Sequence, residues 1–122
     1  MVQLAATTYI FILLGVIVFQ FCLIAGAPWG RMTQGGRHEA SLPISGRVVA
    51  GISVVLLVFM ATGVASEAKL IAGLPKWVPY TGLTIQALSA LLNWITPSRI
   101  ERLIWAPITT LMLTLVLYVV FM

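Results

Sequence analysis

The chain has 122 residues, of which 61% are hydrophobic and only 8% are charged, and its mean hydropathy is +1.08. These values lie far outside the range of soluble proteins, because so few polar side chains cannot cover a water-facing surface. The formal charge is +4, and since the basic residues lie between apolar runs rather than in one patch, the expected acidic partner is the anionic headgroup layer of a membrane and not nucleic acid.

Four apolar segments follow one another along the chain, each with the length that an α-helix needs to cross a hydrocarbon core of about 30 Å. Short connections that contain Gly and Pro separate them. The sequence therefore predicts an all-α, integral membrane four-helix bundle with short loops and no soluble domain. The expected spans are approximately residues 5–27, 47–65, 78–95 and 101–121.

The first segment holds two polar features of interest. Cys22 is the only cysteine, so neither a disulfide nor a CxxC metal site can form within one chain, and we interpret it as a small core residue. Gln20 carries an amide that would be costly to expose to lipid, so we expect it to face a neighbouring helix or another chain.

The third segment has the clearest polar face. Gly82, Gln86, Ser89 and Asn93 follow one another at helical spacing and so share one side of the helix. In one interpretation this face packs inside the bundle, where the two amides form hydrogen bonds across helices. In another it lines a polar cavity, or a pore between protomers.

The fourth segment begins after a junction with two possible capping arrangements. Thr96 could be the N-cap with Pro97 as the first helical residue, or Ser98 and Glu101 could form a capping box. Both place the start of the helix near the same residue. Pro107 lies inside this segment, where membrane helices tolerate proline if neighbours satisfy the freed carbonyl.

The loops indicate an orientation, since short cytoplasmic loops carry an excess of Lys and Arg. Five Arg residues lie in the loops at residues 27–47 and 96–102, whereas the opposite side holds Lys69 and Lys76. We therefore expect both termini on the outer side. Guanidinium groups match phosphate oxygens, so these loops could also bind lipid phosphate, although an ordinary solvated basic loop explains them too. The candidate phosphate-binding residues are Arg31, Arg37, His38, Arg99 and Arg102.

The sequence contains few residues that could support catalysis or bind a cofactor. No ionisable side chain lies near the middle of a span, where pumps, intramembrane proteases and haem-binding bundles need one. His38 lies beside Glu39, but no nucleophile or third group accompanies the pair. We therefore expect no catalytic residues, no metal site and no cofactor.

Two runs carry a resemblance to known sequences. Cys22 to Gly36, CLIAGAPWGRMTQGG, is followed by Leu42-Pro43 and Arg47, and SRIERLIWAPITTLML begins at Ser98. They resemble a group of small, uncharacterised bacterial four-span membrane proteins. The resemblance implies a bacterial plasma membrane location and a four-helix architecture, and it implies no activity.

Three functions are compatible with these features. The first is a non-catalytic interaction protein, either an accessory subunit of a partner membrane protein or a homo-oligomer. The second is an oligomeric channel or carrier for a small solute, lined by the face of Gln86, Ser89 and Asn93. The third is a protein that binds or acts on lipid headgroups through its Arg-rich loops, for which a headgroup-sized pocket would be expected there.

Overall fold

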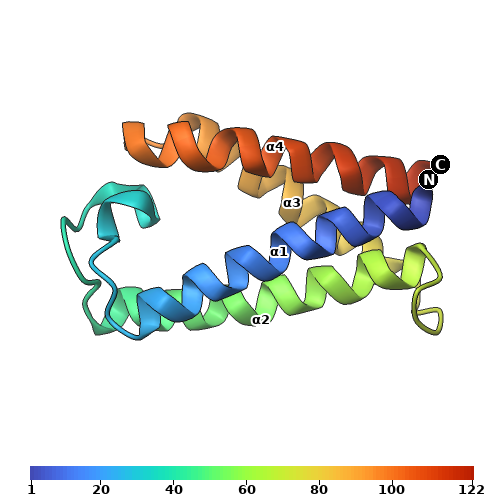
Figure 1. Cartoon of the computed structure of the whole chain (residues 1–122), viewed down its shortest axis with the longest axis horizontal. Coiled ribbons are helices and arrows are strands. Elements are labelled where there is room, and N and C mark those ends of the chain that lie inside the picture. The colour runs from blue at the N-terminus through green and yellow to red at the C-terminus, as the bar shows by residue number, and fades with distance from the viewer.

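The computed structural model describes all 122 residues and contains helices but no strands. The four long helices form one packed bundle, which confirms the predicted fold class, and both chain termini lie at the same end of it (Figure 1). The helices are α1 (Val2–Ile24), α2 (Ile44–Glu67), α3 (Trp77–Ile95) and α4 (Arg99–Phe121).

Three of these helices, α1, α2 and α4, are long and apolar enough to cross a membrane. The third, α3, is shorter, and Gln86 and Asn93 interrupt its apolar sequence. Large apolar side chains such as Phe11, Val55 and Leu103 are mostly exposed on the outside of the bundle, as lipid contact requires. The protein is therefore a multi-pass membrane protein.

The tightest packing lies in the half of the bundle that holds the termini. Small residues let α2 and α3 approach closely, as membrane helices do when no hydrophobic force drives them together. A Cβ atom at Gly63 would lie 3.1 Å from the Cα of Pro79, and one at Gly82 would lie 3.5 Å from the Cα of Met60. The main apolar core is in the same half. It includes Tyr9, Leu13, Met60, Val64, Met112 and Val116.

The other half is wider because the first loop, residues 25–43, folds back between the helix ends (Figure 1). Two short 3-10 helices, η1 (Gly30–Met32) and η2 (Gln34–Gly36), shape this loop, and both contact α4. At the start of α4, Ser98 is the N-cap and its hydroxyl accepts a hydrogen bond from the Glu101 N–H at 3.2 Å. This is one half of the capping box, since the Glu101 side chain bonds elsewhere.

Candidate functional site

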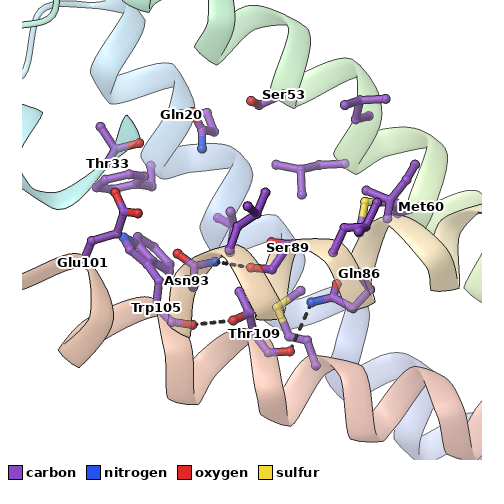
Figure 2. Close-up of a pocket in the computed structure, with 18 of the residues that line it drawn as sticks. Gln20, Thr33, Ser53, Met60, Gln86, Ser89, Asn93, Glu101, Trp105 and Thr109 are labelled. Atoms are coloured by element: carbon purple, nitrogen blue, oxygen red, sulfur yellow. Dashed lines mark hydrogen bonds between the residues drawn. The ribbon is translucent and has the colours of Figure 1, made fainter. Parts of the chain in front are cut away.

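A cavity of about 440 Å³ lies inside the wider half of the bundle, between the four helices and the first loop (Figure 2). Its volume falls in the range of pockets that bind small molecules. All four helices and the first loop contribute to its walls. The polar residues among its lining are Gln20, Thr33, Gln34, Ser53, Gln86, Ser89, Asn93, Glu101 and Thr109.

The inner end of the cavity is closed by a hydrogen-bond network that joins three helices. Gln86 of α3 is only 1% exposed, and its side-chain oxygen accepts a hydrogen bond from the hydroxyl of Tyr9 on α1 at 2.8 Å. Its amide nitrogen donates to the backbone carbonyl of Thr109 on α4 at 3.1 Å. Both ends of the Gln86 amide are thus satisfied inside the protein, as a buried polar group requires.

The polar side chains in the middle of the cavity form no hydrogen bonds to other helices (Figure 2). Asn93 donates to the carbonyl of Ser89 at 2.8 Å, and Ser53 donates to the carbonyl of Val49 at 2.9 Å, so each bonds within its own helix. The amide of Gln20 on α1 makes no hydrogen bond within the chain. The Gln20 amide and the Asn93 carbonyl oxygen are therefore available to a bound molecule.

The first loop forms the third part of the cavity, and α4 holds it in place. The N–H of Gly35 donates to the Glu101 carboxylate at 3.0 Å, and the indole N–H of Trp105 donates to the carbonyl of Met32 at 2.7 Å. The hydroxyl of Ser98 donates to the carbonyl of Arg31 at 2.9 Å. Three side chains, from the N-cap and the first two turns of α4, thus hold this loop in place.

Glycine is required where this loop turns against α4. Gly36 has a φ of +69°, which L-residues with a side chain rarely adopt. A Cβ atom there would also lie 2.7 Å from the Cβ of Ser98. Gly36 therefore permits a close approach of the loop to the start of α4.

Aromatic rings line the same end of the cavity. The ring of Phe19 on α1 lies 4.9 Å from that of Trp105, edge to face, and 5.7 Å from that of Trp29, stacked on it. Phe19 and Trp105 both belong to the cavity lining. Such aromatic pairs stabilise their arrangement beyond simple burial, so this corner is a rigid wall.

One side of the cavity is bordered by exposed leucines. Leu56 on α2 and Leu88 and Leu92 on α3 are 42%, 54% and 60% exposed, and all three belong to the lining. The helices α2 and α3 touch near Gly63 and Gly82, whereas this rim lies further toward the first loop. The rim therefore borders an opening between α2 and α3 on the outer surface that faces lipid.

The four candidate residues of the polar intramembrane face, Gln20, Gln86, Ser89 and Asn93, all line this one cavity. The candidate phosphate-binding residues are not brought together in the same way. Arg31 pairs with Glu39 at 3.4 Å, Arg102 donates to the carbonyl of Thr96, and Arg99 is exposed.

Two of the predicted basic residues do share a second, smaller cavity of about 160 Å³ at the start of α2. Arg37 and His38 line it together with the first residues of that helix. Its remaining lining residues are Gln34, Ser45, Gly46 and Val49.

Sequence reasoning missed the contribution of α4. Glu101, Trp105, Thr109 and Met112 all line the large cavity, and their spacing of four, four and three residues places them on one face of a helix. That spacing was readable in the sequence. The first loop's place in the cavity wall had no such signal.

No protein-family model, no curated protein and no solved structure matches this chain. The resemblance of the runs beginning at Cys22 and Ser98 to small bacterial four-span proteins therefore stays a prediction.

Proposed function

We propose that this protein binds a small amphiphilic molecule inside the bundle and takes it up from the bilayer between α2 and α3. The main support for the proposal is the cavity of about 440 Å³. Exposed leucines border it on the lipid-facing surface, and the side-chain amides of Gln20 and Asn93 inside it can form hydrogen bonds with a ligand. Pockets of this kind, mostly apolar with a few directed polar groups, are the usual binding sites of small molecules.

The lining suits a molecule with one polar and one apolar end. Glu101, Thr33 and Trp105 lie where the first loop closes the cavity, whereas Met60 lies toward its inner end (Figure 2), in the same apolar core as Met112 and Leu57. A polar headgroup would lie next to the first loop, close to the membrane–water interface. The apolar chain would lie among the inner side chains and the leucines of the rim.

Binding is favoured over passage through the bundle. The hydrogen bonds of Gln86 join α1, α3 and α4 across the inner end, and the contact of Gly63 with Pro79 holds α2 against α3 beyond it. A channel of the predicted kind would need that end to open. Catalysis is not part of the proposal, because none of the serine and threonine hydroxyls in the lining is hydrogen-bonded to Glu101, the only ionisable side chain there.

For the membrane arrangement we propose four spans with both termini outside, in a bacterial plasma membrane. The loop end carries five Arg, whereas the other end carries only Lys69 and Lys76. This excess of basic residues supports an orientation with the loop end inside. Anionic headgroups would contact that end, where Arg37 and His38 line the smaller cavity.

The test measures binding of 2-bromooctanol by tryptophan quenching in detergent. Trp77 and Trp94 are replaced by Phe, so that the remaining indoles of Trp29 and Trp105 both lie beside Phe19 at the cavity. We expect saturable quenching, because a bromine bound in the cavity lies near these rings. Ser89→Phe fills the cavity and should weaken this binding at least severalfold.

Ala87→Phe is the matched control, since Ala87 is exposed on the same helix and does not line the cavity. Ser53→Phe fills the same space from α2 and guards against a local folding defect in α3. Equal, linear quenching in the parent protein and all three variants would mean that the probe only dissolves in the micelle. That result would refute the proposal.

A further inference from the structure

The most buried carboxylate of the protein, Glu101, has no cationic partner. The chain has three carboxylates: Glu39 pairs with Arg31 at 3.4 Å, and Glu67 pairs with Lys76 at 2.8 Å. No Lys, Arg or His nitrogen lies within 4.0 Å of Glu101, although its residue is only 8% exposed. A carboxylate removed from water normally needs a charged partner or several hydrogen bonds.

The protein supplies only part of what this carboxylate needs. One oxygen of Glu101 accepts the N–H of Gly35 at 3.0 Å, and the position in the first turn of α4 gives some support from the helix dipole. The second oxygen accepts no hydrogen bond from the chain. Because Glu101 belongs to the lining of the large cavity, a bound molecule can supply the missing partner.

The rings beside this carboxylate suit a cation. Trp105 lies one helical turn after Glu101 on the same face of α4, and Phe19 lies 4.9 Å from its ring across the cavity corner. The electron-rich faces of Trp and Phe attract ammonium groups, and aromatic walls are how proteins recognise quaternary ammonium ligands. A carboxylate with two aromatic rings in one cavity is therefore a suitable receptor for such a group.

We propose that the amphiphile is a cation: an ammonium group on an apolar chain, with the ammonium at Glu101 and Trp105 and the chain directed toward Met60. This inference rests on the proposed function, because it concerns the same cavity. The loop end carries five Arg and two Glu, a net charge of +3, so long-range attraction does not favour a cation there. Selection must come from the short-range contacts with Glu101 and the rings.

Two kinds of molecule carry an ammonium group on an apolar chain: a lipid with a zwitterionic headgroup, and a hydrophobic ammonium compound without a phosphate. The experiment compares three octyl probes, each with the headgroup on the first carbon of the chain and bromine on the second. They are (2-bromooctyl)trimethylammonium, 2-bromooctylphosphocholine and 2-bromooctanol. Quenching of Trp29 and Trp105 is followed in the protein that lacks the other two tryptophans.

The decisive variant is Glu101→Gln, which keeps an oxygen that can accept the Gly35 N–H and replaces the charged carboxylate with a neutral amide of the same shape. Its matched control is Glu39→Gln, which removes a carboxylate from the same loop end outside the cavity. We expect the parent protein to bind the ammonium probe roughly tenfold or more tightly than 2-bromooctanol, the ratio that corresponds to about 1.4 kcal/mol. Glu101→Gln should lower the ratio of the two affinities at least severalfold, because only the rings then favour the ammonium, and Glu39→Gln should leave that ratio unchanged.

The outcomes separate the two proposals. Saturable binding of 2-bromooctanol with no preference for the ammonium probe, or a preference of the same size in Glu101→Gln as in the parent protein, would refute the cation inference and leave the cavity's function standing. Absence of saturable binding by any probe would refute both. If the ammonium is preferred, equal binding of the phosphocholine probe identifies a lipid headgroup as the source, and its exclusion identifies a simple hydrophobic ammonium compound.

Discussion

Replacing Gln86 with Leu tests whether the network at the inner end of the cavity holds the bundle together. Leucine has a similar volume, so the change removes hydrogen bonds without leaving a large void. Both lost bonds, to Tyr9 and to the carbonyl of Thr109, join different helices. Interhelical hydrogen bonds in membranes contribute about 0.6 kcal/mol each on average, which gives about 1.2 kcal/mol for the pair.

The larger part of the cost comes from the hydroxyl of Tyr9. This residue is fully buried, and Gln86 is the acceptor of its hydroxyl, so Gln86→Leu leaves a buried donor without a partner. An orphaned buried group costs about 1–3 kcal/mol. The expected loss in the free energy of unfolding is therefore about 2–4 kcal/mol.

A double-mutant cycle with Tyr9→Phe isolates that part. The phenylalanine has no hydroxyl to leave unsatisfied, so Tyr9→Phe with Gln86→Leu should be more stable than Gln86→Leu alone by at least about 1 kcal/mol. Unfolding is measured by circular dichroism as sodium dodecyl sulfate is added to mixed micelles. Asn93→Leu is the control and should cost less than about 0.5 kcal/mol, because its amide bonds only within α3. A double variant no more stable than Gln86→Leu would show that the unsatisfied hydroxyl of Tyr9 costs nothing and would refute this reasoning.

Three further predictions follow from the loops. Gly36→Ala should destabilise the protein by about 1–3 kcal/mol, because residue 36 has a φ of +69° and a Cβ atom there would clash with Ser98. Gly73→Ala is the control and should not destabilise the protein, because the space around Gly73 is open. Equal melting temperatures of the two variants would contradict this prediction. With Cys22 replaced by Ala, an external thiol reagent should label a cysteine at Ala72 and spare one at Ala40, both of which are exposed, and the reverse pattern would invert the proposed orientation. The pKa of Lys76 is raised above its ordinary value of 10.5, mainly by the hydrogen bond to Glu67 and, to a smaller extent, by the negative charge of Glu67. The pair's contribution to stability should therefore be complete below pH 10.5 and disappear as the pH rises through the raised pKa, and a melting profile in which Lys76→Met shows the same alkaline loss would refute this.

The sequence predicted the bundle well because hydropathy and helical periodicity are local properties. Apolar segments, turn residues and the polar face of α3 all depend on neighbours a few positions apart. The same reasoning placed Gln86 on one face of the helix with Ser89 and Asn93, but it treated the two amides alike. Their difference depends on distance from other helices: Gln86 reaches Tyr9 and Thr109, whereas Asn93 borders open space and bonds to Ser89.

The first loop marks the limit of such reasoning. Its Arg and Gly residues are typical of a solvated basic loop, yet it contacts Ser98, Glu101 and Trp105, residues about 70 positions away in the sequence. Two of these contacts use backbone carbonyls of the loop and one uses a backbone N–H, groups that every residue type carries. Side-chain identity therefore gives no signal for them. Only the glycines, which permit the close approach to α4, are visible in the sequence.

These contacts also explain how a short chain can combine a stable bundle with an internal cavity. Packing is concentrated in the half that holds the termini, where Gly63 and Gly82 bring α2 and α3 together and Gln86 joins the other helices. In the opposite half, van der Waals attraction between the helices would otherwise favour their direct contact. The first loop, held by α4, keeps the helix ends apart there. The space left between the loop and the Gln86 network is the cavity in which we place the ligand.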